Sequence, residues 1–138
     1  MSKRVLIDTA IPLFAVGGAA AERAECQQVL QQIAENQLDA YASVEMIQEA
    51  VFHRMRVGER AAAVQFGRDL AELITILDFD KKVLTKALEL METCSIRGRD
   101  AVHAATAFVN GIDTIISTDP AYATVPGLAL AHPTAFID

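Results

Sequence analysis

The stretch that decides the fold covers residues 97–120 and reads RGRDAVHAATAFVNGIDTIISTDP. Its pattern predicts a helix over residues 98–110, ended by a glycine, and then a strand over residues 114–118 that is rich in β-branched side chains. Asp100 lies in the first turn of the helix, and Asp119 lies just past the strand. Because a helix and the strand that follows it run antiparallel in an α/β sheet, we expect both acids at one edge of the fold.

Two more segments place acids at the same edge. Residues 4–7 are a short strand, apolar after Arg4 and typical of a parallel strand buried on both faces, and Asp8 follows it directly. A helix is predicted over residues 43–57, where Ser43 caps its start after a strand. Glu45 and Glu49 are four residues apart near that start, so they share one face of the helix.

The remaining pattern alternates between helices and strands. Helices are predicted over residues 11–16, 20–36, 59–74 and 80–94, and strands over residues 38–42, 74–77 and 128–131. The helix over residues 80–94 is expected to bury Val83, Leu84, Ala87, Leu88 and Met91. This alternation predicts an α/β fold with a short parallel β-sheet flanked by helices, and a protruding helical hairpin over residues 43–74.

Length and composition set the broad class. The 138 residues suit a single domain over residues 1–138, and 52% hydrophobic residues can supply a sizeable core. The net charge of −6 argues against a general polyanion binder, but not against a nuclease whose metal site is itself acidic. Cys26 and Cys94 are far apart and read as reduced thiols of a cytoplasmic protein. No apolar run is long enough for a membrane span, and the first residues lack the apolar core of a signal peptide.

The acids point to metal chemistry when they are taken together. Alone, each has an ordinary explanation as a helix cap, a turn former or a first-turn acid. Converging on one crevice at the carboxyl ends of the strands, Asp8, Glu49, Asp100 and Asp119 would repel one another unless a cation lay among them. Oxygen ligands suit Mg²⁺ or Mn²⁺, and no zinc-type cluster of His and Cys is present. Glu45 is expected to be a solvated rim residue instead.

The segments around these acids also carry a family resemblance. They read VLIDTAIPLFA at Asp8, SVEMIQEAVFHR at Glu49, RGRDAVHAATAFVNGID at Asp100 and IISTDPAY at Asp119. In this order and spacing the chain resembles the PIN-domain ribonucleases, and it is most similar to the VapC-type toxins of bacterial toxin–antitoxin pairs. The resemblance covers essentially the whole chain and selects Glu49 over Glu45.

The resemblance implies a metal-dependent endoribonuclease, a hydrolase that cleaves RNA with metal-activated water. Asp8, Asp100 and Asp119 would hold the Mg²⁺ or Mn²⁺ ion, and Glu49 would join them directly or through water. It also implies an RNA substrate, a cognate antitoxin protein and a homodimer, with no membrane association. The alternative is a catalytically weak PIN-like module that serves protein association.

Neighbouring residues are expected to support the acids. Thr9 and either Ser117 or Thr118 would add hydrogen bonds around the metal site. Two departures from the family pattern are mild: Ala10 replaces a frequent asparagine, and Pro120 replaces a frequent charged residue. Neither departure removes an acid.

Three basic side chains flank the acids. His103, one helical turn after Asp100, is expected to be a hydrogen-bonded, partly buried histidine and not a ligand or base. Arg97 and Arg99 have two equal readings, as contacts to RNA phosphate or as counter-charges of the acidic edge. Other α/β phosphate enzymes fit less well: Ala10 stands where haloacid-dehalogenase-type enzymes need a second aspartate, and receiver domains need a late lysine that this chain lacks.

Overall fold

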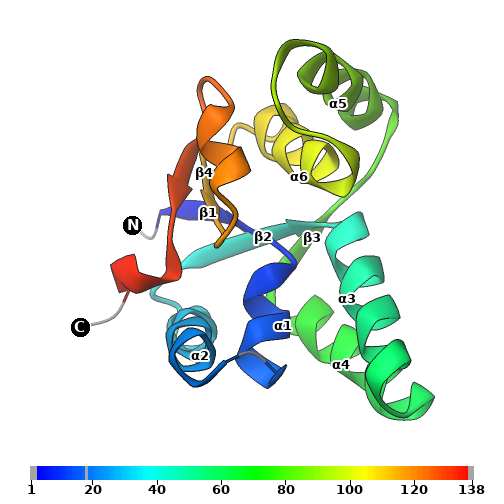
Figure 1. The fold of residues 1–138 in the computed structure, drawn as a ribbon, viewed down its shortest axis with the longest axis vertical. Helices are drawn as coiled ribbons and strands as arrows, with labels where there is room; N and C mark the ends of the chain where they lie inside the picture. Colours follow the sequence, from blue (N-terminus) through cyan, green and yellow to red (C-terminus); the bar gives the residue numbers. More distant parts are fainter. Residues whose placement is uncertain (1–2, 18, 137–138) are drawn as a thin grey trace.

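The fold is a parallel sheet between two layers of helices (Figure 1). The computed structural model describes residues 3–17 and 19–136. Five strands, all parallel, follow the order β3-β2-β1-β4-β5. They are β1 (Arg4–Ile7), β2 (Asp39–Ser43), β3 (Thr75–Leu77), β4 (Thr114–Ile116) and β5 (Ala129–Ala131). The predicted α/β class with a short parallel sheet is confirmed.

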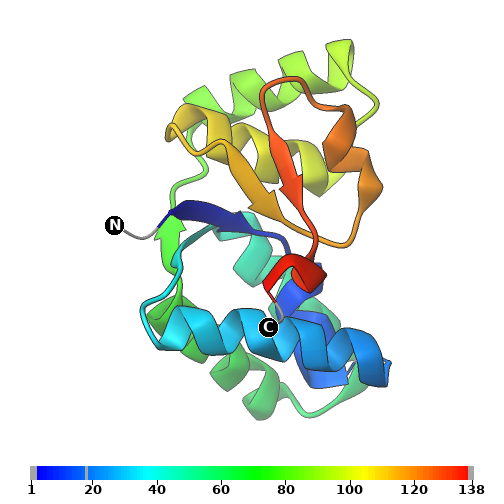
Figure 2. The same ribbon diagram turned by 90° about the vertical axis from the view of Figure 1, so that its left-hand side faces the viewer.

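Within the described residues, six α-helices and two 3₁₀-helices connect and follow the strands. They are α1 (Ala10–Gly17), α2 (Ala20–Ala34), α3 (Val44–Val57), α4 (Arg60–Leu73), α5 (Lys81–Thr93), α6 (Gly98–Val109), η1 (Pro120–Thr124) and η2 (Pro133–Phe136). The helices α5 and α6 lie on one side of the sheet and α1 to α4 on the other (Figure 2). Strand β1 is central, so Leu6 packs into one layer while Val5 and Ile7 pack into the other. This explains why β1 is apolar at Val5, Leu6 and Ile7, while Arg4 at its start is exposed.

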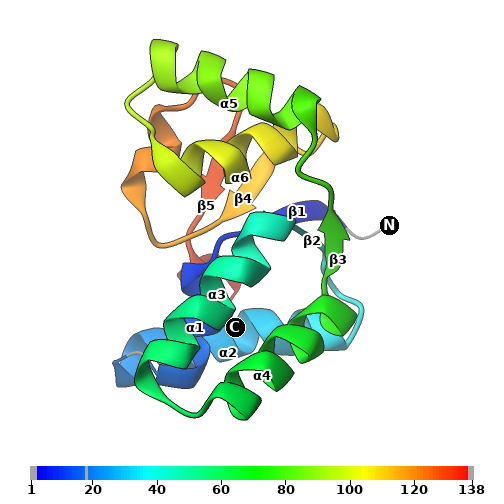
Figure 3. The same cartoon turned by 90° about the vertical axis from the view of Figure 1, so that its right-hand side faces the viewer.

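The predicted hairpin is formed by α3 and α4, which lie side by side with their turn at the end away from the sheet (Figure 3). Ser43 caps α3, since its Oγ accepts a hydrogen bond of 3.0 Å from the backbone N–H of Met46. Gly67 of α4 lies against Val51 of α3, and a Cβ added at this glycine would overlap the valine side chain. Close approach of the two helices therefore depends on that glycine.

The expected buried face of α5 is partly wrong. Val83 and Ala87 are buried as predicted, and Leu90 joins them. Leu84, Leu88 and Met91 are 45%, 55% and 37% exposed. The reason is that α5 packs mainly on α6, at the outer side of the fold, so a narrow stripe suffices for its contacts. No helix in the described ranges is long and apolar enough to cross a bilayer.

Candidate metal centre

Asp8 lies at the centre of the candidate site, at the carboxyl end of β1. Its side chain is almost fully buried, and its backbone N–H donates to the carbonyl of Ile116 over 3.1 Å. Each carboxylate oxygen accepts one hydrogen bond: Oδ2 from Ser117 Oγ at 2.6 Å and Oδ1 from Tyr122 Oη at 3.1 Å. Strand β4 ends at Ile116, earlier than predicted, and Ser117 follows it directly. The hydrogen bond expected of Ser117 or Thr118 is thus made by Ser117.

Asp100 comes to the same point from the first turn of α6. The chain enters this helix through Gly98, whose φ of +60° is a conformation that glycine adopts without strain. Asp100 is half-buried, and its Oδ1 accepts a hydrogen bond of 3.1 Å from the same Tyr122 hydroxyl. Burial raises the pKa of Asp100 above its ordinary value, and the charge of Asp8 raises it further. The negative charges of Asp8 and Asp100 therefore repel each other.

His103 is the fully buried centre of a hydrogen-bond chain beside these acids. Its Nδ1 lies 2.7 Å from Ser43 Oγ, and its Nε2 lies 3.2 Å from Thr9 Oγ1. Thr9 Oγ1 in turn donates to Glu49 Oε1 at 2.6 Å. Every donor has an acceptor when Ser43 donates to Nδ1 and Nε2 carries the proton, which assigns the tautomer from the network. The predicted hydrogen bonding of His103 is confirmed, and the side chain is fully buried where partial burial was predicted.

Glu49 is joined to the site through Thr9 and His103. The ligand atoms of Asp8, Asp100 and His103 lie within 4.8 Å of one another, and among the described residues Glu49 is not part of that group. Burial would raise the pKa of Glu49, but hydrogen bonds from His103 and Thr9 outweigh it, so the pKa is lowered. Glu49 is held as a carboxylate at the rim of the site.

Arg99 crosses the acidic edge beside Glu49. Its Nε lies 3.2 Å from Glu45 Oε1, and its Nη1 lies 3.5 Å from Glu49 Oε2. The guanidinium is half-exposed, so these ion pairs contribute little to stability. Of the two readings of Arg99, the structure favours the counter-charge.

Asp119 approaches the site from the end of β4. Its Oδ1 accepts a hydrogen bond of 2.9 Å from the N–H of Ala121, which caps η1 and orients the acid. Its charge contributes to the raised pKa of Asp100. Asp100, Asp119 and Arg97 are among the residues that line a cavity of about 620 Å³. A ligand in this cavity would meet both acids and one cation.

Two contributors were missed at the level of sequence: Ser43 as the partner of His103, and Tyr122 as the group between two acids. Ser43 was recognised only as a helix cap. Tyr122 is one of two tyrosines and lies three residues after Asp119. Its hydroxyl group, so close in sequence to the candidate acid Asp119, is the feature from which a role in the site could have been predicted.

The donor set fits a hard divalent cation. The converging groups Asp8 and Asp100 are carboxylates, and Asp119 faces the cavity that adjoins them. The Nε2 of His103 carries a proton donated to Thr9, so it offers no lone pair to a metal. The negative charge of Asp8 helps to raise the pKa of Asp100, and a bound cation would neutralise that charge. Mg²⁺ or Mn²⁺ suits such oxygen ligands better than zinc.

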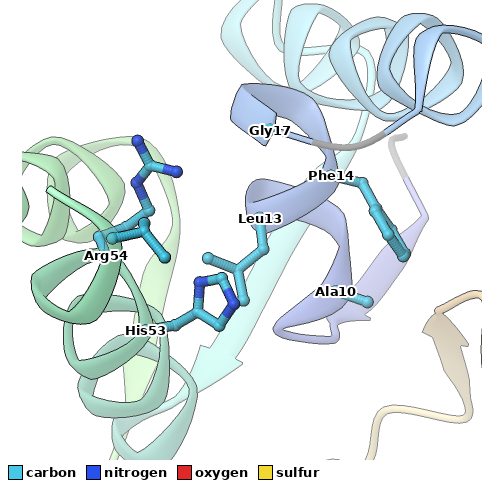
Figure 4. A pocket seen from close by; sticks show the side chains of 7 residues that line it. Ala10, Leu13, Phe14, Gly17, His53 and Arg54 are labelled. Atoms are coloured by element: carbon cyan, nitrogen blue, oxygen red, sulfur yellow. The ribbon is translucent and has the colours of Figure 1, made fainter.

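A second hollow lies outside the acidic centre. This α1–α3 groove has a volume of about 660 Å³. Figure 4 shows α1 on one side and α3 on the other, with His53 and Arg54 facing Leu13 and the rest of α1. The lining residues are Ala10, Leu13, Phe14, Gly17, His53, Arg54 and Val57. The groove begins at Ala10, two residues after Asp8, so a segment bound in it would lie beside the acids.

Comparison with known proteins gives one consistent result. A family model for the PIN domain matches residues 5–128. Ribonuclease VapC7 of Mycobacterium tuberculosis is 28% identical over 139 residues, which cover 95% of this chain and 92% of that protein. The VapBC2 complex from Rickettsia felis, bound to a DNA fragment from its promoter, contains a chain with a TM-score of 0.73 and 16% identity, covering 94% of this chain and 98% of that one. VapC20 of M. tuberculosis, described as a sarcin–ricin loop cleaving toxin, has a TM-score of 0.68 and 16% identity, covering 84% of this chain and 90% of that one.

Proposed function

Because the chain belongs to the PIN-domain family, we propose that it is a metal-dependent endoribonuclease and the toxin of a type II toxin–antitoxin pair. The observation that carries the proposal is the convergence of Asp8 and Asp100 on one point, with Asp119 facing the adjoining cavity. We further propose that residues 1–138 act as a single cytoplasmic domain.

Asp8, Asp100 and Asp119 are the proposed metal ligands, and Mg²⁺ is the proposed ion, with Mn²⁺ as its substitute. When bound, such an ion lowers the pKa of water and stabilises charge on a phosphate. Glu49 is ionised and fixed by Thr9, so it is placed to orient a water molecule at the rim. Ser117 and Tyr122 orient Asp8 by donating to its two oxygens.

RNA is the proposed substrate. The related VapC7 is named a ribonuclease, and VapC20 is described as a sarcin–ricin loop cleaving toxin. With a net charge of −6, this chain does not attract polyanions over its whole surface, so RNA must be held locally. Arg97 lies in the wall of the cavity that Asp100 and Asp119 line, where it can contact a phosphate next to the cleaved bond.

A cognate antitoxin and a second copy of the chain are the proposed protein partners. The relative from Rickettsia felis was solved as a VapBC complex. The α1–α3 groove offers Leu13, Phe14 and Val57 to an apolar antitoxin segment. The stripe of Leu84, Leu88 and Met91 on α5 offers an apolar face to a second copy.

The test compares Asp8→Asn and Asp100→Asn with the parent in metal-dependent melting and in RNA cleavage. Saturating Mg²⁺ or Mn²⁺ is expected to stabilise the parent by mass action, about 2.7 kcal/mol at a hundredfold excess over Kd. Both variants should lose most of this stabilisation and cleave RNA at least about a hundredfold more slowly. Asp69→Asn is the matched control, because Asp69 is exposed on α4, where its carboxylate accepts a hydrogen bond from Gln65.

Two results would contradict the proposal. Variants that cleave RNA as fast as the parent would remove Asp8 and Asp100 from the chemistry. A parent that neither binds metal nor cleaves RNA, yet binds its protein partner tightly, would favour the catalytically weak interaction module.

A further inference from the structure

Tyr122 places a single hydroxyl between two of the proposed metal ligands. Its Oη is 3.1 Å from Asp8 Oδ1 and 3.1 Å from Asp100 Oδ1. The residue is fully buried, and its ring packs in the core layer formed with α5 and α6. Asp119 caps η1, the short helix that carries Tyr122, so the ring is fixed from its backbone side as well. The hydroxyl therefore cannot move away without disturbing the core.

This hydroxyl has one proton and faces two carboxylates. A hydrogen bond to an ionised acceptor is stronger than one between neutral groups, and here two such acceptors share the donor. Burial and the charges of Asp8 and Asp100 raise the pKa of the phenol far above its ordinary value, so it remains a donor. In the absence of a cation, the phenol is the donor that lies between the two carboxylate oxygens.

We propose that the Tyr122 hydroxyl is the counter-group of Asp8 and Asp100 when no divalent ion is bound, so that it stabilises the metal-free protein and weakens metal binding. The inference rests on the metal site proposed above. The physical reason is that the hydrogen bonds of the Tyr122 hydroxyl differ in strength between the metal-free and the metal-bound protein. The hydrogen bond is strongest while the carboxylates carry their full charge, and a cation that neutralises them weakens it. That loss is subtracted from the free energy of metal binding.

The substitution Tyr122→Phe tests this role because it removes the hydroxyl and keeps the ring that fills the core. Tyr41→Phe is the matched control: the Tyr41 hydroxyl also donates to a carboxylate, Asp39 Oδ2, at 3.1 Å. Asp39 is the first residue of β2, at the end of the sheet opposite the acids. Each variant therefore removes a tyrosine hydroxyl that donates to a carboxylate: Tyr122→Phe does so at the acids of the site, and Tyr41→Phe does so at Asp39.

Two measurements on the full chain are needed: Mn²⁺ affinity by titration calorimetry, and melting temperature in EDTA. Tyr122→Phe is expected to bind Mn²⁺ at least about threefold more tightly than the parent, since it gives up no hydrogen bond on binding. It is also expected to melt at a lower temperature in EDTA. Tyr41→Phe should bind Mn²⁺ with the affinity of the parent. A Tyr122→Phe protein that folds only in the presence of Mn²⁺ would be the extreme form of the expected result.

The contrary outcomes separate this role from the site itself. Weaker Mn²⁺ binding by Tyr122→Phe would mean that the hydroxyl helps to hold the ion, and equal binding would mean that it plays no part; both overturn the proposal while the metal site stands. A parent that binds no Mn²⁺ would overturn the metal site and this inference together.

Discussion

At the scale of single residues, the site is a small set of buried polar groups that satisfy one another. Ser43, His103, Thr9 and Glu49 form one chain of hydrogen bonds, and Asp8 accepts two donors of its own. Among the described residues, no buried side-chain nitrogen or oxygen lacks a partner. Polar groups buried this way hold their neighbours in one geometry, because each lost partner leaves an unsatisfied group. The unbalanced feature is electrostatic: Asp8 and Asp100 repel each other.

Asp100→Asn is expected to stabilise the metal-free protein at neutral pH. The pKa of Asp100 is raised in the fold, first by burial and second by Asp8. A raised pKa means that the protonated form favours folding: its contribution is present below the unfolded-state pKa and is lost as pH rises through the folded-state pKa. Asparagine carries no charge, so the variant avoids that loss. Its melting temperature in EDTA should exceed that of the parent near pH 7.

The advantage should shrink as the pH falls and Asp100 of the parent becomes protonated. The matched control is Asp69→Asn, which removes a carboxylate on the exposed face of α4 that accepts a hydrogen bond from Gln65. A metal-free Asp100→Asn protein that melts below the parent at neutral pH would show that repulsion from Asp8 is not the dominant effect at this position.

At the scale of elements, α5 shows how a helix can be recognised while its buried face is not. Asp80 caps the helix by accepting from Val83 N–H, and its bounds follow the predicted ones closely. Apolar side chains occur on more than one of its faces, so periodicity alone could not choose the stripe that packs on α6. Leu84, Leu88 and Met91 remain exposed as a second apolar stripe. An apolar stripe of this kind on an otherwise polar helix is typical of an interface.

Leu88→Glu is expected to convert a dimer into a monomer. Leu88 is the most exposed residue of the stripe at 55%, and a charge there would have to be buried between two copies related by a twofold axis. Sedimentation equilibrium measures the change. Val16→Glu on α1 introduces the same charge at a residue that is 45% exposed, and this control should remain dimeric. A Leu88→Glu protein that stays dimeric, or a parent that is monomeric, would place the interface elsewhere or remove it.

At the scale of the whole molecule, the parallel sheet brings the acids and the groove to one edge. Asp8 ends β1, and α1 starts two residues later, so the α1–α3 groove opens next to the acidic centre. A ligand in the groove would therefore lie near a cation in the metal site. Coupling between two such sites is reciprocal: each ligand changes the affinity of the other by the same factor.

Binding of the antitoxin is expected to weaken metal binding. An antitoxin segment in the groove can reach the acids with a basic side chain, which would compete with the cation for the same carboxylates. Mn²⁺ affinity should be measured for the free toxin and for its complex with the antitoxin, and a decrease of about tenfold or more is expected. Equal affinities in the two states would show that the antitoxin acts without touching the metal centre.

The local sequence pattern was enough to predict the fold class and the placement of the acids. The alternation of apolar strands with amphipathic helices determined the parallel α/β sheet, because each element can be read from its own periodicity and strands joined by helices run parallel. The same reasoning placed Asp8, Asp100 and Asp119 at one edge, since strand ends and helix starts meet there. These are properties of neighbours along the chain.

Tertiary structure alone decided what happens between distant elements. It decided that Tyr122 lies between Asp8 and Asp100, and that Ser43 reaches His103 across 60 residues of chain. It also decided that α5 leaves an apolar stripe uncovered. Such outcomes depend on how side chains from separate elements fill the same space, and distances of a few ångströms across a packed core are not encoded in the periodicity of any one segment.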